Sequence, residues 1–200
     1  MTARPAAALV VCSSPRTGSG LLCSALWSTG LCGEPDEYLA AETRREYEAA
    51  WGTTGDRAYV EALLQRTTTP NGVFAMKVHW EHTPHTQWLA SSLDVSSDDV
   101  LGTLRAIAPH VSFVRTSRRD RVRQAVSLYK RRVRRHKPPP TVAPSSSASD
   151  DLTFDYDAIH RLVTELESFE QRWDECFADA GIRPMRVVYE DDLEHGYVAT

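Results

Sequence analysis

The sequence predicts an α/β protein in which a parallel sheet is covered by helices on both faces. Short apolar segments that are typical of buried strands alternate with longer segments whose apolar residues recur at helical spacing. This alternation is typical of parallel sheets, because each parallel connection uses a crossover helix. The length of 200 residues fits a single domain, 1–200, and 42% hydrophobic residues are enough for a core.

Four short segments rich in Val and other apolar residues are the predicted strands. They are Ala6–Cys12, Val73–Val78, His110–Arg115 and Met185–Tyr189. The first strand leads into a polar turn-forming loop, Ser13–Gly20, and the second follows the turn signal Asn71-Gly72.

The segments between these strands predict helices. They are Leu21–Gly30, Glu42–Trp51, Asp56–Arg66, Ser97–Ala108, a basic helix from about Arg119, and a long helix that begins at Asp157 and closes at Gly181. Ser97 and Asp157 are the predicted N-caps of the fourth and sixth helices. An apolar stripe from Ile159 to Phe177 predicts that the last helix packs in the core. The Pro- and Ser-rich segment Pro138–Asp151 predicts an exposed flexible loop.

The sequence favours a cytoplasmic protein with no membrane span. No apolar run approaches the ~20 residues of a membrane helix, and the N-terminus lacks the features of a signal peptide. Four cysteines form no C-x-x-C pair and no zinc-finger spacing, so we expect free thiols packed as small apolar residues.

Positive charge is concentrated in one segment. The net charge is −4, yet Arg115–Lys137 holds eleven Lys or Arg residues and a single acid, a charge of +10, which leaves −14 on the rest of the chain. Such a segment indicates either an anionic ligand or a strongly solvated basic helix.

The polar loop after the first strand predicts a phosphate or sulfate site. A strand, a small polar loop and a helix in succession present backbone N–H groups at the helix N-terminus. Hydroxyls and the Arg16 guanidinium add donors. The Walker pattern with its Lys and metal-holding hydroxyl is absent, and the third Gly of a dinucleotide fingerprint is replaced by Cys23. These departures point away from ATP; the alternative is an ordinary surface turn.

A second anion site is predicted at the start of the basic helix. The segment Ser117–Ser127 begins where a parallel strand ends, at the usual ligand edge of such sheets. Arg118 or Arg119 at its start and Ser127 about two turns later could hold a phosphate. Two anion sites on one edge predict a nucleotide with two separated phosphates.

These segments resemble a known family. The loop SSPRTGSGLL looks like the 5′-phosphosulfate loop of sulfotransferases that use 3′-phosphoadenosine 5′-phosphosulfate (PAPS), and RRDRVRQAVSLYKR looks like their 3′-phosphate segment. The blocks TGLCGEPDEYL, NGVFAMKVHW, RRDRVRQAVS, FDYDAI and GIRPMRVVYEDDL, in that order, resemble the bacterial trehalose 2-sulfotransferase family over most of residues 8–193. The resemblance implies a single-domain sulfotransferase fold with a P-loop-NTPase-like sheet, and transfer of a sulfuryl group from PAPS to a carbohydrate or specialised-metabolite hydroxyl without a metal.

The resemblance also implies roles for individual residues. Those expected to hold the 5′ side of PAPS are Ser14, Arg16, Thr17, Gly18, Ser19 and Gly20, where Gly20 replaces the Ser or Thr usual in relatives. Arg119 and Ser127 would hold the 3′-phosphate, with Arg118 adjacent. Glu37 would be the general base and Glu34 would contact the acceptor. A carboxylate base is worth ~10²–10⁴ in rate.

Two further groups near the predicted active site have less specific predicted roles. Lys77, at a strand end, is a candidate cation for the bridging oxygen of the transferring group. His79, His82 and His85 have the spacing H-x-x-H-x-x-H, but Pro84 interrupts any helix and H-E-x-x-H is absent, so we expect no metal site. His79 is instead expected to line the substrate site and is the reserve base.

Two other functions fit parts of the sequence. A P-loop small-molecule kinase would use the strand end Val187–Asp191 to hold magnesium. A non-catalytic nucleic-acid-binding module would use Arg115–Lys137, although Tyr129 is the only aromatic residue nearby, which makes a nucleic-acid partner unfavoured. The resemblance leaves a homodimer open. Relatives continue with another helix where this chain stops seven residues after Leu193, which suggests a short C-terminus.

Overall fold

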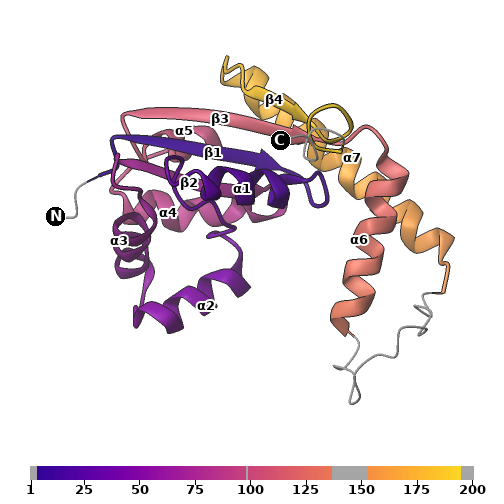
Figure 1. Cartoon of the computed structure of the whole chain (residues 1–200), viewed down its shortest axis with the longest axis horizontal. Helices are drawn as coiled ribbons and strands as arrows, with labels where there is room; N and C mark the ends of the chain where they lie inside the picture. The colour runs from indigo at the N-terminus through magenta and orange to yellow at the C-terminus, as the bar shows by residue number, and fades with distance from the viewer. Residues whose placement is uncertain (1–3, 98, 137–152, 195–200) are drawn as a thin grey trace.

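The computed structural model describes residues 4–97, 99–136 and 153–194 as a four-stranded, fully parallel sheet with helices on both faces (Figure 1). The strands are β1 (Ala7–Ser13), β2 (Val73–His79), β3 (His110–Ser117) and β4 (Met185–Val188). Their order in the sheet is β2-β1-β3-β4, and every pair is parallel. The predicted α/β class is therefore confirmed, and the carboxyl ends of β1, β2 and β3 meet at one edge.

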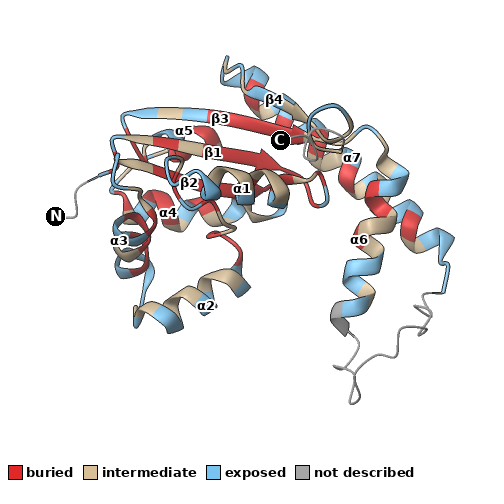
Figure 2. Cartoon of the chain, viewed as in Figure 1, coloured by how far each residue is buried: buried red, intermediate tan, exposed pale blue. Residues whose placement is uncertain are grey.

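Alternate residues of β1 face two separate layers of core. Ala8, Val10 and Cys12 lie in the larger cluster, while Val11 packs with Cys23 on the opposite face. β1, β2 and the second half of β3 are almost continuously buried, as Figure 2 shows for β1 and β3, whereas β4 contains no buried residue. Each buried aliphatic or aromatic side chain contributes about 1.5–3 kcal/mol, so these two layers fix the position of the strand ends.

Seven α-helices of the described residues surround the sheet. They are α1 (Ser19–Ser28), α2 (Ala41–Trp51), α3 (Asp56–Thr67), α4 (Thr86–Ser92), α5 (Val100–Arg105), α6 (Arg121–His136) and α7 (Tyr156–Asp179). A 3₁₀ helix, η1 (Trp80–His85), follows β2, and a π-helical turn, η2 (Tyr189–Leu193), follows β4. Within the described segments, no helix has the length and apolar character needed to cross a membrane.

The prediction that Pro84 interrupts any helix is wrong. Pro84 lies inside η1, which continues into α4, and neither element was predicted. Pro84 is the fifth of the six residues of η1 and lies two residues before α4, so the α-helical hydrogen bonds of α4 begin only after it.

Two predicted helix starts are also wrong. Asp99, not Ser97, caps the fourth predicted helix by accepting a hydrogen bond from the Gly102 N–H at 2.5 Å, and that helix ends at Arg105 rather than Ala108. Asp155, not Asp157, caps α7 by accepting from the Ala158 N–H at 2.9 Å. Each segment contains two Ser or Asp residues that could cap the helix. The residue that does so is the one whose side chain accepts a hydrogen bond from the backbone N–H three positions later in the chain.

The apolar stripe of α7 packs in two places. Its first half, Ile159 to Leu166, packs against Ala125 and Leu128 of α6, and its second half, around Trp173, joins the larger core. The stripe therefore fixes α6 beside the sheet edge (Figure 1). The predicted loop Pro138–Asp151 lies outside the described residues. All four cysteines are unpaired thiols, with Cys12 and Cys23 buried.

Candidate active site

The loop between β1 and α1 is the centre of the site at the carboxyl edge of the sheet. β1 ends at Ser13 and α1 begins at Ser19, so the loop precedes helical N–H groups that have no partner within the helix. Gly18 has a φ of 80°, and a Cβ there would lie 2.7 Å from Tyr189 Cδ2 and 2.8 Å from Leu193 Cδ1. Both the left-handed backbone and the limited space therefore favour glycine at this position.

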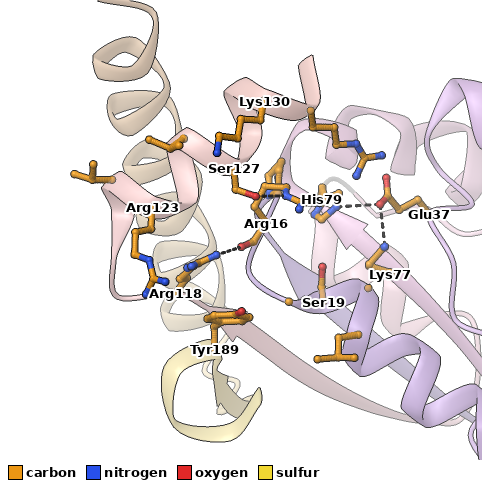
Figure 3. Close-up of a pocket in the computed structure, with 17 residues that line it drawn as sticks. Arg16, Ser19, Glu37, Lys77, His79, Arg118, Arg123, Ser127, Lys130 and Tyr189 are labelled. Atoms are coloured by element: carbon orange, nitrogen blue, oxygen red, sulfur yellow. Dashed lines mark hydrogen bonds and ion pairs between the residues drawn. The ribbon is translucent and has the colours of Figure 1, made fainter. Parts of the chain in front are cut away.

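A cavity of about 680 Å³ opens beside this loop (Figure 3). Its walls come from the loop, the start of α1, the end of β2, α6 and Tyr189 after β4. Among the described residues, six cationic side chains and one carboxylate line it. They are Arg16, Lys77, Arg118, Arg123, Lys130, Arg131 and Glu37. This excess of positive charge suits a ligand with several negative charges.

The predicted loop residues divide between the cavity and the interior. Those that line the cavity are Arg16, Gly18, Ser19 and Gly20. Ser14 and Thr17 are buried behind the loop instead, where the Ser14 hydroxyl donates to Glu170 at 2.5 Å. The Thr17 hydroxyl lies 2.8 Å from that of Thr116 and 3.1 Å from the Ser14 carbonyl oxygen. Ser14 and Thr17 thus hold the loop from its inner side.

Glu37, Lys77 and His79 form one cluster at the end of the cavity. Lys77 Nζ lies 2.9 Å and His79 Nε2 3.1 Å from the same oxygen, Glu37 Oε1. Lys77 and His79 are buried on β2, and Glu37 lies in the segment before α2. The Lys77 N–H also donates to the Asp36 carbonyl at 2.9 Å, which fixes the Glu37 segment against β2.

The neighbours of Glu37 keep it ionised. Burial alone would raise the pKa of Glu37, but the hydrogen bond and charge of His79, together with Lys77, outweigh it and hold the pKa well below its usual range. His79 is held in turn by Ser13, whose Oγ lies 2.8 Å from His79 Nδ1. The cluster therefore presents a fixed carboxylate beside a cation at the mouth of an anion site.

Arg16, Arg118 and Ser127 meet on the other side of the cavity. Arg16 Nε donates to Ser127 Oγ at 2.8 Å, and Arg118 Nη1 donates to the Arg16 carbonyl at 3.4 Å (Figure 3). Burial, with the charges of Arg131 and Arg118, lowers the pKa of Arg16. The Arg118 guanidinium also lies 4.2 Å from the centre of the Tyr189 ring. Mutual repulsion among these cations would be relieved by a bound anion.

Arg119 lies apart from the other predicted phosphate residues. Its side chain is exposed, pairs with Asp191, and is not among the residues that line the cavity. The Arg119 backbone N–H donates to Glu190 at 3.0 Å. Both arginines contact the acidic turn η2, Arg118 through Glu190 at 3.7 Å, but only Arg118 also lines the cavity.

Several cavity residues were missed by the sequence analysis. Arg123, Lys130 and Arg131 lie four residues before, three after and four after Ser127, which puts all of them on one face of α6. Helical spacing from Ser127 could have found them. Tyr189 follows β4 and had no such signal.

A second cavity of about 260 Å³ adjoins the first and shares Gly20 and Lys77 with it. It lies between α1 and α2, and Glu34 lines this cavity rather than the first. The residues that give it its character are two acids and three aromatic side chains: Glu34, Asp36, Trp27, Tyr38 and Tyr47.

The three spaced histidines follow the end of β2 into η1. The rings of His79 and His82 are 5.9 Å apart, and those of His82 and His85 are 6.3 Å apart. In the part of the chain that the structure describes, no group of three His, Cys, Asp or Glu side chains could hold a metal ion.

Comparison with known proteins places this site in a family. A family model described as Stf0 sulphotransferase matches residues 8–199. Trehalose 2-sulfotransferase from Mycobacterium tuberculosis (strain ATCC 35801 / TMC 107 / Erdman) is 29% identical over 209 residues, with 90% of this chain and 76% of that protein covered. Trehalose 2-sulfotransferase from Mycolicibacterium smegmatis (strain ATCC 700084 / mc(2)155) is 28% identical over 220 residues, with 94% of this chain and 79% of that protein covered. Since the family match spans almost the whole chain, including both walls of the cation-lined cavity, this chain belongs to the Stf0 sulphotransferase family and is a sulfuryl-transferring enzyme.

Proposed function

We propose that this enzyme transfers the sulfuryl group of PAPS to a hydroxyl of a carbohydrate or specialised metabolite, with Glu37 as general base. The observation that carries the proposal is the position of the Glu37–Lys77–His79 cluster at the end of a cavity lined by six cations. A donor with a 5′-phosphosulfate and a 3′-phosphate has the charge that such a cavity would attract.

Different groups of the cavity suit the two ends of this donor, and Arg16 lies between them, since its Nε donates to Ser127 Oγ at 2.8 Å. The loop with Arg16 and Ser19, at the N-terminus of α1, would hold the phosphosulfate. Arg118 and Ser127 would hold the 3′-phosphate from α6 and the strand end before it. Arg119 would join them only by leaving its ion pair with Asp191.

The reaction then needs a base and a cation at the centre. The acceptor oxygen forms a bond to sulfur, and the bond between sulfur and the bridging phosphate oxygen breaks, which releases adenosine 3′,5′-bisphosphate. The acceptor proton passes to the Glu37 carboxylate. Lys77 would stabilise the negative charge that develops on the bridging oxygen.

The ion pair with Lys77 weakens Glu37 as a base. A carboxylate whose pKa is held low accepts a proton poorly. Donor binding would draw Lys77 toward the sulfate oxygens, which would raise the pKa of Glu37. Glu37 would thus become a stronger base once the donor is present, while the hydrogen bond from His79 continues to orient it.

The second cavity is the proposed acceptor site. It reaches the first cavity at Lys77, and it combines carboxylates with aromatic rings such as Trp27, 61% exposed. Carboxylates bind sugar hydroxyls and aromatic faces cover the apolar side of a ring, which fits the carbohydrate that the relatives' names specify.

The donor is tested by ligand-dependent thermal stability. Adenosine 3′,5′-bisphosphate at 100 times its Kd should add about 2.7 kcal/mol to the stability of the folded chain, whereas Mg·ATP should add little. Turnover with PAPS should persist in EDTA. Stabilisation by Mg·ATP alone, or loss of turnover in EDTA, would contradict the proposal.

The base is tested with Glu37→Gln. The amide keeps the shape of the side chain but cannot take a proton, so turnover should be lost while adenosine 3′,5′-bisphosphate still binds. Glu34→Gln is the matched control, since it changes a nearby carboxylate that lies outside the first cavity and should raise only the acceptor KM. Retained turnover in Glu37→Gln would remove Glu37 as base.

A further inference from the structure

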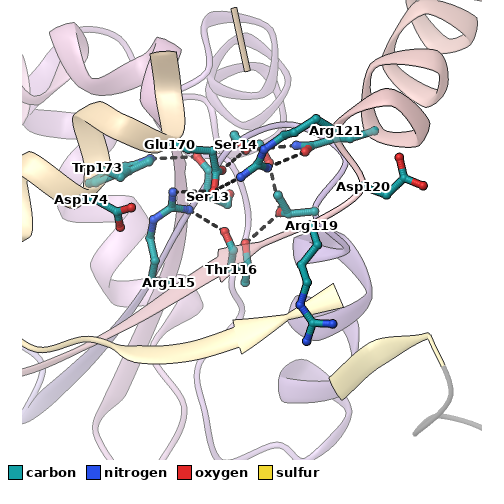
Figure 4. A network of polar contacts seen from close by, with 12 residues as sticks. Ser13, Ser14, Arg115, Thr116, Arg119, Asp120, Arg121, Glu170, Trp173 and Asp174 are labelled. Carbon is teal, nitrogen blue, oxygen red and sulfur yellow. Dashed lines mark hydrogen bonds and ion pairs between the residues drawn. The ribbon is translucent and has the colours of Figure 1, made fainter. Parts of the chain in front are cut away.

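We propose that Glu170 is a positioning residue that sets the geometry of the donor loop from behind, an inference that rests on the proposed donor site. Glu170 lies on α7 and is 8% exposed (Figure 4). Its Oε1 accepts a hydrogen bond from Ser14 Oγ at 2.5 Å, so a residue far along the chain contacts the loop directly.

The other oxygen of Glu170 binds two cations from different elements. Arg115 Nη2 of β3 lies 3.0 Å and Arg121 Nη2 of α6 lies 2.9 Å from Glu170 Oε2. Arg115 is 2% exposed, and its Nε has no hydrogen-bond partner among the described residues. Glu170 is therefore the carboxylate that compensates two buried or half-buried guanidinium groups.

A second connection from α6 reaches the same loop. Arg121 Nη1 donates to Gln124 Oε1 at 2.8 Å. The fully buried Gln124 then donates through Nε2 to the Pro15 carbonyl at 2.7 Å and to Ser14 Oγ at 3.2 Å. Loop, β3, α6 and α7 are thus joined by one network of charge-assisted hydrogen bonds.

The next turn of α7 also holds the loop. Trp173, three residues after Glu170, is fully buried and donates from Nε1 to the Ser13 carbonyl at 2.9 Å. The hydroxyl of Ser13 in turn contacts His79, the neighbour of Glu37. The same helix therefore positions the donor loop and supports the base cluster.

Glu170 acts only through other residues. Glu170, Arg115 and Gln124 do not line the donor cavity, whereas the loop between them and the cavity does. A shift of the Ser14 side of the loop would move the N–H groups at the start of α1 and the Arg16 side chain. Positioning errors of this kind act on donor binding and on the reaction rate, not only on stability.

The test compares Glu170→Gln with Glu170→Asp. The first removes the charge at unchanged size, and the second keeps the charge but withdraws the carboxylate from Ser14. In both we expect the Kd of adenosine 3′,5′-bisphosphate by calorimetry and the KM of PAPS to rise, and kcat/KM for PAPS to fall about tenfold. The acceptor KM should stay unchanged.

The matched control is Glu165→Gln on the same helix. Glu165 forms a two-pronged ion pair with Arg132 of α6, at 3.1 and 3.0 Å, away from the loop. This variant should lose an ion pair between the same two helices, α6 and α7, without any change in donor Kd. All variants are assayed well below their midpoints of thermal unfolding, so that the folded fraction is the same.

The outcomes separate positioning from folding. A purely structural Glu170 would lower only the active fraction, hence kcat, with donor Kd and KM unchanged, and that result would overturn the inference. If Glu170→Gln does not fold, Glu170→Asp decides by the same donor Kd. If the unaltered chain itself fails to bind adenosine 3′,5′-bisphosphate, the proposed function fails and this inference fails with it.

Discussion

His79 lies between a hydroxyl and a carboxylate, and these partners fix which ring nitrogen carries the proton. An ionised Glu37 can only accept, so His79 Nε2 carries the hydrogen at 3.1 Å. In the neutral ring, Nδ1 then accepts from Ser13 Oγ at 2.8 Å, and in the charged ring, which lowers the pKa of Glu37, Nδ1 carries a hydrogen as well. No lone pair of the neutral ring is left for an acceptor hydroxyl, which favours Glu37 over His79 as the base.

His82 is expected to make the fold sensitive to acid. Burial, with the nearby charge of His79, lowers the pKa of His82 to about 4. As the pH falls, His82 therefore binds a proton near pH 6.5 in the unfolded chain but only near pH 4 in the folded chain. Stability from a neutral His82 is present above pH 6.5 and is lost as the pH falls toward 4.

The measurement is urea unfolding of His82→Gln between pH 7 and 4. The unaltered chain should lose stability on the order of 1 kcal/mol more than the variant over this range, a value reduced by solvent screening of a side chain that is not fully buried. His110→Gln, at the exposed start of β3, controls for the loss of an imidazole. Parallel pH curves for His82→Gln and the unaltered chain would refute the expectation.

The strands and most helices could be predicted from local sequence, because β1 and β2 are buried along nearly their whole length and therefore carry a plain apolar signal. Val73–Val78 and Val73–His79 differ by one residue, for example. Helix starts were less predictable, since Asp155 and Asp157 are chemically equivalent and only the backbone geometry selects one. The short α4 carries too few residues for a period to show.

The strand, loop and helix of the proposed donor site could be predicted from the sequence, but the direction of each side chain could not. Ser14, Thr17 and Ser19 read alike in sequence, yet only Ser19 lines the cavity. Glu170 lies in what reads as a core stripe, and its contact with Ser14 spans 156 residues. Such pairing depends on how α7 packs across the sheet edge, which no local pattern encodes.

The segment before Glu37 packs so closely on β2 that one glycine controls it. Gly33 has a φ of 71°, and a Cβ there would lie 2.4 Å from the Ala75 nitrogen and 2.8 Å from the Phe74 carbonyl carbon. Gly33→Ala must therefore push the segment away from β2 and separate Glu37 from Lys77. Steady-state kinetics should show kcat reduced at least about tenfold, with donor KM little changed.

Gly30→Ala is the matched control for this substitution. Gly30 has a similar φ of 65°, but a Cβ there would meet open space. Both variants should lose about 1–2 kcal/mol for the left-handed backbone, and only Gly33→Ala should lose kcat. Equal kcat in the two variants would mean that the close packing on β2 does not position Glu37.

Across the whole molecule, the basic segment is divided among several tasks. Arg118, Arg123, Lys130 and Arg131 line the donor cavity. Several cations of the segment, both inside and outside this lining, pair with acids: Arg118 with Glu190, Arg119 with Asp191, Arg121 with Glu170, Arg123 with Glu194 and Arg132 with Glu165. Among the described residues of the segment, acids and a concave cavity interrupt the positive charge, which disfavours a nucleic-acid-binding module.

Because the chain as a whole is acidic, we expect binding of the anionic donor to depend on the salt concentration. The chain carries −4 overall, so attraction of a polyanion comes from the local field of the cavity, which salt screens over about 10 Å at 0.1 M. Raising NaCl from 20 to 500 mM should increase the PAPS KM roughly tenfold and leave the KM of a neutral acceptor nearly constant. Arg131→Gln, which removes one cation from the cavity, should start from a higher PAPS KM and show a weaker salt dependence. Equal salt dependence of both substrates would instead point to a general effect on the fold, and the cation-lined cavity would lose its assignment as the donor site.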